Sequence, residues 1–386
     1  MTSPATRELV GAGDNDKWKA FAAIGLSFFT MVMTMSMVYV ALSSIADDFD
    51  VTLRAVSWVV IAEALVISAL MLPMGRLADI VGRKKIHMIG LTIFGIGAVF
   101  TALAPTFWLL IVARVFMATG NAMGQSVGTA MVVAIFPAEE RGKAIGSQTT
   151  AVSIGGASGP IVAGLMLEVF PWEALFLMLT VPVVIALIAA YFWLDEERVS
   201  AGKDQVSGPF DWVGAGISGL AVTVLVLTIN NPFGVAWLSP LILGGAALFV
   251  ALLVYFIRWE LRRTDPMLQL RLFRIPTFAL AVLTRLLGFM ASTTTRFLLP
   301  IFLISYRGLS EGAAGGLLFL ISLGMGLAAQ TAGRLSDRFG TRPFAIGGIA
   351  LLALTGSAMG LMNDGTSTVL LAIVVFLSGI ANGTWN

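Results

Sequence analysis

The sequence predicts an all-α polytopic membrane protein with about twelve spans. Of its 386 residues, 58% are hydrophobic and only 12% are charged, and the mean hydropathy is +0.91. A water-soluble domain of this size could not cover its surface with so few charges. Apolar runs of about 18 to 28 residues recur along the chain, and about 20 helical residues cross the hydrocarbon core. Runs such as LFLMLTVPVVIALIAAYFWL lack the alternation of a membrane β-strand, which favours helices.

Twelve apolar segments are long enough to be spans. The polar start, residues 1–17, carries acidic residues and precedes an apolar run that is too long for a signal peptide, so we interpret it as a cytoplasmic tail before a retained first span. We place the spans at 18–43, 56–74, 86–103, 107–134, 144–167, 172–194, 212–229, 239–257, 276–304, 312–332, 344–362 and 366–385.

The basic residues predict the orientation of these spans. Nineteen lysines and arginines fall in the tail and the even-numbered loops, whereas the odd-numbered loops contain only Arg54 and Arg307. By the positive-inside rule, the N-terminus and the even loops are cytoplasmic, and we expect a multi-pass protein of the inner (cytoplasmic) membrane. The net charge of +2 is too small to suggest a nucleic-acid partner.

One charged stretch occurs twice. GRLADIVGRKK at 75–85 and GRLSDRFGTRP at 333–343 each follow an apolar run on the predicted cytoplasmic side. Gly75 lies 57 residues after Trp18, where the first span begins, and Gly333 lies 57 residues after Pro276, where the ninth begins. Parallel repeats of six spans are a recurring transporter design, with the substrate site near the midplane between the halves.

The repeat divides the chain into parts. The second repeat contains only four of six expected spans, so we expect a sequence truncated at its C-terminus, or alternatively a complete but divergent twelve-span protein. LLAIVVFLSGIANG at 370–383 matches LLIVARVFMATGNA at 109–122, with Val375 in the place of Arg114. The predicted parts are a tail (1–17), a six-helix half (18–194), a cytoplasmic linker (195–211), two inserted helices (212–257), a cytoplasmic loop (258–275) and a partial second half (276–386).

These motifs together resemble the major facilitator superfamily. GRLADIVGRKK is similar to the family's signature between spans two and three, and LLIVARVFMATGNA to its arginine motif in span four. GGASGPIVAG at 155–164 resembles the glycine-proline motif of antiporters. Two inserted helices entered through FDWVGAG resemble the fourteen-span branch of drug:proton antiporters. The chain departs from that branch in span one, where Thr34 replaces the usual acid, and in span two, where Glu63 replaces tyrosine.

Glu63 and Arg114 are the predicted proton-coupling residues. Both lie seven residues inside the outer ends of their spans, about 10 Å deep, so they can form an ion pair. Burial of a carboxyl group favours its protonated form and a nearby arginine favours its charged form, so a pair that separates during transport would change its proton affinity. The alternative is a static pair that fastens span two to span four.

Other polar residues inside spans are candidates for a substrate cavity. Arg285 lies about 13 Å deep in span nine, where it could face an anionic group. The amide side chains could equally be hydrogen-bonding contacts between helices. The predicted cavity residues are Trp58, Asn121, Gln125, Gln148 and Arg285.

The two signature copies are predicted gating loops, and Asp79 with Arg83 is a predicted latch that breaks when the inner gate opens. The resemblance implies that this latch holds the outward-facing state against the opposite half. The GGASGPIVAG stretch is a predicted hinge, because proline bends a helix and small residues let backbones approach. The gating residues are Gly75, Arg76, Asp79, Gly82, Arg83, Lys84, Gly333, Asp337 and Gly340, and the hinge residues are Gly155, Gly159, Pro160 and Gly164.

The sequence favours a transporter over an enzyme. With one histidine, His87, and no cysteine, it predicts no metal cluster, and it contains no phosphate-binding loop, so we expect no cofactor and an ion gradient as the energy source. The resemblance implies proton-coupled export of lipophilic or cationic compounds by alternating access. The alternatives are a metabolite facilitator or symporter, and a truncated, non-transporting membrane scaffold. Neither the identity of the substrate nor the oligomeric state follows from the sequence.

Overall fold

The computed structural model describes residues 14–200, 210–231, 234–263, 265–309, 311–363 and 365–385. Within these ranges all regular secondary structure is helical, and twelve helices are long and apolar enough to cross a membrane. The predicted all-α class is therefore confirmed. Most of the predicted tail and residues 201–209 of the predicted linker lie outside the described residues.

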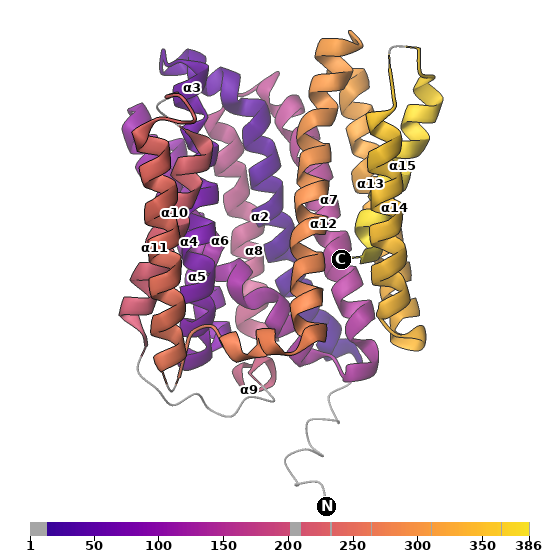
Figure 1. Cartoon of the computed structure of the whole chain (residues 1–386). Coiled ribbons are helices and arrows are strands. Elements are labelled where there is room, and N and C mark those ends of the chain that lie inside the picture. Colours follow the sequence, from indigo (N-terminus) through magenta and orange to yellow (C-terminus); the bar gives the residue numbers. More distant parts are fainter. Residues whose placement is uncertain are drawn as a thin grey trace, which may run out of the picture. The chain divides into compact units, whose positions relative to one another are not determined.

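The twelve long helices follow the predicted spans in order (Figure 1). Several extend further at their cytoplasmic ends by the predicted orientation, because a helix continues beyond the apolar run that defines a span. They are α2 (Asp14–Asp48), α4 (Trp58–Val81), α5 (Arg83–Ala102), α6 (Phe107–Ile135), α7 (Arg141–Leu167), α8 (Glu173–Trp193), α10 (Trp212–Asn230), α11 (Pro240–Arg262), α12 (Pro276–Ile301), α13 (Glu311–Phe339), α14 (Arg342–Gly360) and α15 (Thr368–Trp385). Short helices are α3 (Leu53–Val56), η2 (Ala138–Glu140), α9 (Glu196–Val199), η3 (Leu270–Arg274) and η4 (Phe302–Tyr306).

The chain forms two compact units. Unit 1 contains residues 1–27, 37–135 and 163–274, and unit 2 contains residues 28–36, 136–162 and 275–386. Most of α7 thus groups with the second repeat, although it belongs to the first by sequence. Glycines explain this grouping, because a side chain on Gly142 or Gly146 would overlap the backbone of α13.

In unit 1, glycines bring α5 and α6 into close contact. A Cβ atom on Gly97 would overlap the backbone of Met117, and one on Gly90 would overlap Met123.

Helix α10 lies between α4 and α11 (Figure 1). Its first turn is capped by Asp211, whose Oδ1 accepts a hydrogen bond from the Gly214 amide at 3.0 Å. The other oxygen of Asp211 accepts from Trp259 Nε1 at 2.8 Å, which fastens the two inserted helices together.

In unit 2, α15 packs closely on α13 and α14. A Cβ atom on Gly379 would overlap the carbonyl of Ile321, and one on Gly383 would overlap that of Met325. Ile321 and Val375 belong to one buried apolar cluster that joins α13 to α15. This helix pair is held by close backbone approach and apolar burial.

Candidate functional site

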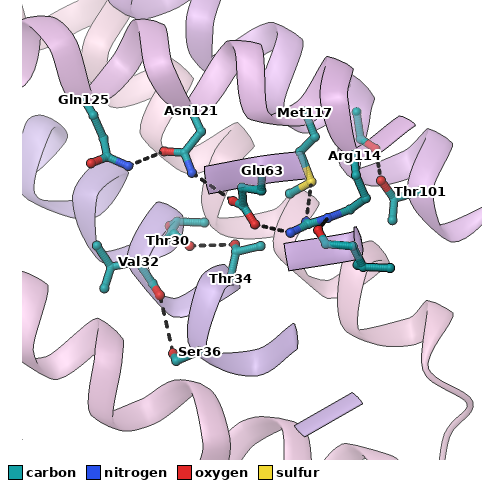
Figure 2. A network of polar contacts seen from close by, with 12 residues as sticks. Thr30, Val32, Thr34, Ser36, Glu63, Thr101, Arg114, Met117, Asn121 and Gln125 are labelled. Atoms are coloured by element: carbon teal, nitrogen blue, oxygen red, sulfur yellow. Dashed lines mark hydrogen bonds and ion pairs between the residues drawn. The ribbon is translucent and has the colours of Figure 1, made fainter. Parts of the chain in front are cut away.

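A buried polar network joins α4 and α6 in unit 1 (Figure 2). Glu63 is 2% exposed, Arg114 1% and Asn121 0%. Glu63 Oε2 forms an ion pair with Arg114 Nη2, and Glu63 Oε1 accepts a hydrogen bond from Asn121 Nδ2 at 3.1 Å. Both oxygens of this carboxylate therefore have partners, which a buried charge requires.

The network continues along α6 in the direction of the predicted cytoplasmic side. Gln125 Nε2 donates to Asn121 Oδ1 at 2.7 Å, one helical turn away. Arg114, Asn121 and Gln125 lie at spacings of seven and four residues, which places them on the same face of the helix. The structure thus brings together both predicted coupling residues and two of the predicted cavity residues.

Three further groups hold the guanidinium of Arg114. Its Nε donates to the carbonyl of Val59 at 3.4 Å, and its Nη1 lies 3.5 Å from the sulfur of Met117. The guanidinium carbon lies 5.5 Å from the centre of the Phe176 ring, which belongs to α8. Nothing in the local sequence around Phe176 predicts this contact, because the two residues are 62 positions apart.

The second repeat replaces the ion pair by apolar residues. The offset between the two signature loops aligns Glu63 with Ile321, and the motif alignment aligns Arg114 with Val375. Both replacements are buried in the apolar cluster between α13 and α15. A helix pair of this kind can therefore form without a buried charge.

A polar contact missed by the sequence analysis lies in unit 2. Asn382, which aligns with Asn121, contacts the hydroxyl of Ser292 on α12, and its Nδ2 donates to the carbonyl of Ser378 at 2.8 Å. The alignment of the two motifs could have predicted a role for Asn382, because it places Asn382 at the position of Asn121. The offset between the two signature copies could have done the same for Ser292, because it aligns Ser292 with Thr34.

The remaining predicted cavity residues are spread over both units. Trp58 is half-buried at the start of α4 in unit 1. Gln148 is buried on α7 and Arg285 is exposed on α12, both in unit 2, where Arg285 lies 5.3 Å from the centre of the Trp385 ring.

The first signature copy is mostly helix, not loop. Gly75 to Val81 belong to α4, and the chain turns at Gly82, whose φ of 116° is a conformation that side-chain-bearing residues rarely adopt. The prediction that the span ends at residue 74 and that Gly75 lies in a loop is wrong, because Gly75 lies inside α4. In the second copy Gly333 lies inside α13, and Gly340 turns with φ of 82°.

The charged residues of the first copy bind the ends of neighbouring helices in unit 1. Arg83 Nε lies 3.6 Å from Asp79 Oδ1, and Arg83 Nη1 donates to the carbonyl of Val199 at 2.9 Å. Lys84 Nζ donates to the carbonyl of Leu194 at 2.5 Å. Because helix C-termini carry partial negative charge, these cations stabilise the ends of α8 and α9. Arg76 is half-buried on the last turns of α4.

The second copy makes a different contact. Both oxygens of Asp337 accept hydrogen bonds from the first turn of α7, from the Gly142 amide at 2.7 Å and the Lys143 amide at 2.9 Å. A carboxylate at a helix N-terminus satisfies free amides and the positive end of the helix dipole. Gly333 packs directly on the Gly142 carbonyl, which brings Asp337 within reach.

The predicted hinge on α7 is a continuous helix that contains Pro160. Within unit 2, Gly155 faces the Phe29 backbone and Gly159 faces Met33 and Ser36, so a Cβ at either would overlap the 28–36 segment of α2. No described atom lies within 4 Å of a Cβ placed on Gly164, so close packing does not require glycine there.

Twelve candidate spans and a charged signature that occurs twice define an integral multi-pass membrane protein built as secondary transporters are built. The family model described as Major Facilitator Superfamily matches residues 24–385, and the chain belongs to this superfamily. It is therefore a transporter and not an enzyme.

Curated relatives include transporters of different named functions. The riboflavin transporter RibZ of Clostridioides difficile is 29% identical over 371 residues, which cover 96% of this chain and 79% of RibZ. The multidrug resistance protein Stp of Mycobacterium tuberculosis (strain CDC 1551 / Oshkosh) is 29% identical over 361 residues, covering 92% of this chain and 66% of Stp. The chain thus spans just under two thirds of the length of Stp, and 60% of the Bacillus subtilis transporter YhcA.

The crystal structure of the human organic anion transporter MFSD10 has the same fold. It matches with a TM-score of 0.69 at 15% identity, covering 96% of this chain and 84% of MFSD10. At this level of identity the likeness concerns the fold alone.

Proposed function

We propose that this chain is a proton-coupled antiporter that exports lipophilic or cationic compounds by alternating access. It belongs, in this proposal, to the fourteen-span branch, with α10 and α11 as the inserted helices, and it lies in the inner membrane with a cytoplasmic N-terminus. It uses no cofactor, and the proton gradient supplies the energy.

The observation that carries the proton-coupling proposal is the buried pair Glu63–Arg114. A buried ion pair is a weak source of stability, since apolar residues of similar volume often serve as well or better. The second repeat joins α13 to α15 with apolar residues at the aligned positions. Packing alone therefore gives no reason to keep two charges between α4 and α6, and buried ionisable residues inside spans commonly belong to ion or proton pathways.

The contacts of Glu63 allow proton binding to alternate with formation of the ion pair to Arg114. In the structure the Glu63 carboxylate has one cationic partner, Arg114, and one amide donor, Asn121. Movement of α4 relative to α6 would leave the carboxyl group in apolar surroundings, where it binds a proton. Return of α4 would release that proton as the pair forms again. Gln125 and Asn121 provide polar groups beside the site for proton transfer or substrate contact.

The names of two relatives favour different substrate classes. Stp is named a multidrug resistance protein, which favours export of drug-like compounds. The name of RibZ favours a second candidate, transport of a planar aromatic metabolite such as a flavin. Substrate-induced proton release from the purified protein distinguishes them, with cationic dyes and riboflavin as the two probes.

The experiment that tests the coupling uses Glu63→Gln in proteoliposomes with an imposed pH gradient. We expect loss of gradient-driven dye transport, with exchange of dye down its own gradient retained. Glu139→Gln is the matched control, because Glu139 is an exposed carboxylate on η2 and not part of the network. Unchanged gradient-driven transport by Glu63→Gln would overturn the coupling role.

A further inference from the structure

In the proposed proton coupling, protonation of Glu63 removes the negative charge that faces Arg114. When Glu63 binds a proton, Arg114 keeps its positive charge while 1% exposed to solvent. Arginine does not lose its proton in proteins, so other groups must stabilise the cation at that point. The candidates are the groups in contact with it: the carbonyl of Val59, the sulfur of Met117 and the ring of Phe176.

Phe176 is the one of these groups that comes from outside the α4–α6 pair. The carbonyl of Val59 belongs to α4, so it moves with Glu63, and Met117 lies on α6 with Arg114 itself. The ring of Phe176 is carried by α8 and is 1% exposed. Its contact with Arg114 does not depend on α4.

The orientation of the Phe176 ring is fixed by its aromatic neighbour. Trp172 is 4% exposed and packs against Phe176 at 6.0 Å between ring centres, at an angle of 81°. The indole of Trp172 donates to Asp48 Oδ2 at 3.1 Å and contacts the Phe49 ring at 5.8 Å. The ring is therefore held between a tethered tryptophan and the guanidinium.

We propose that Phe176 is a positioning residue for Arg114, whose aromatic face holds the guanidinium in place while Glu63 is protonated. This inference rests on the proposed proton coupling and adds a third residue to that site. The attraction between a cation and an aromatic face is strongest where water is excluded, which is the case for two side chains that are each 1% exposed. Arg114 then stays in register to form the ion pair again when the proton leaves.

The charged and titratable surroundings of the pair are few among the described residues. Glu63 comes from α4 and Arg114 from α6, and Tyr39 of α2 interacts electrostatically with Glu63. From α8 the contact is the uncharged Phe176. A change in the ring's electrostatics therefore acts mainly on Arg114.

The sharpest test keeps the shape of the ring and changes only its charge distribution. Trifluorophenylalanine at position 176, introduced by nonsense suppression, weakens the negative face of the ring at nearly constant volume. The weakened ring stabilises the Arg114 cation less while Glu63 is neutral. Protonation of Glu63 should therefore require a lower pH. We expect the pH midpoint of gradient-driven dye transport to move to lower pH by roughly half a unit.

The same substitution at Phe94 is the matched control. Phe94 is a fully buried phenylalanine of α5 in the same unit, and no cation contact is found for it among the described residues. Trifluorophenylalanine at 94 should leave the pH midpoint unchanged. An unchanged midpoint for position 176, or equal shifts at both positions, would overturn the positioning role.

A stability measurement separates this inference from the proton-coupling proposal. In the Glu63→Gln background Arg114 lacks its anion permanently, so we expect trifluorophenylalanine at 176 to lower the unfolding temperature in detergent more than it does in the parent chain. Additive effects of the two changes would contradict the inference. Failure of the coupling proposal appears instead as unchanged transport by Glu63→Gln alone, which this measurement does not depend on.

Discussion

The helix pairs α4–α6 and α13–α15 occupy corresponding places in the two repeats, but they are joined by opposite means. Between α4 and α6 lie a carboxylate and a guanidinium with an amide beside them. Between α13 and α15 the aligned residues are Ile321 and Val375, in an apolar cluster with glycines at the contact. The apolar pair shows that packing alone can join helices of this kind, and this is why we propose a role in proton coupling for the charged pair.

The two signature copies differ in a similar way. Asp79 in the first copy lies beside Arg83 of its own turn, whereas Asp337 in the second caps α7, a helix of the first repeat. The aspartate that the two copies share thus makes a local ion pair in one place and a contact over 195 residues of sequence in the other. The motif fixes the turn, and the neighbouring helices decide what its aspartate binds.

The largest effect should come from removing one of the two paired charges between α4 and α6. Arg114→Met leaves Glu63 buried without its cation, and we expect a loss of about 3 to 5 kcal/mol in unfolding free energy. Adding Glu63→Leu makes the pair apolar, as in the second repeat, and should recover most of that loss while gradient-driven transport stays absent. Denaturant unfolding in detergent measures both variants. If the double variant is as unstable as the single one, the comparison between the repeats does not hold.

A smaller effect should separate the two glycines of the first signature copy. Gly82→Ala places a Cβ at a positive φ and within 2.9 Å of the Glu196 carboxylate, so we expect a cost of about 1 to 3 kcal/mol. Gly75→Ala, whose nearest neighbour would be 3.9 Å away, should be neutral or slightly stabilising because the residue is helical. Thermal unfolding compares them, and equal costs would contradict the assignment of the turn to Gly82.

Removal of the long-range cap should cost less. Asp337→Ala leaves the Gly142 and Lys143 amides without their acceptor, and we expect a loss of about 1 kcal/mol. Hydrogen exchange at the start of α7 should accelerate, while exchange in α4 and α5 should not change. Unaltered exchange at Gly142 and Lys143 would show that water replaces the carboxylate at no cost.

The smallest effect on stability should come from Asp79→Asn. The ion pair with Arg83 is partly exposed, and such pairs contribute about 0 to 1 kcal/mol. If Asp79 forms a latch, the transport rate should change more than the unfolding free energy does. Wild-type transport by Asp79→Asn would contradict the latch, and the first signature copy would then serve only to set the orientation of the chain in the membrane.

The sequence was sufficient for features that depend on local pattern. Hydropathy predicted the twelve long helices, and equal depth in two spans predicted that Glu63 could meet Arg114, which the structure brings into contact. The contacts of Phe176 and Asp337 depend on which helices become neighbours, and no local pattern contains that information. The helical state of Gly75 was also missed, because glycine at the end of an apolar run is compatible with both helix and turn.

The cap on α7 has a consequence for the order of events during synthesis. Gly142 leaves the ribosome 195 residues before Asp337, which is about 10 to 40 s at ordinary elongation rates. Throughout that interval the first turn of α7 has to rely on water or on temporary partners. A premature stop between the two positions would therefore release a chain that contains α7 but lacks the carboxylate that accepts from its first amides.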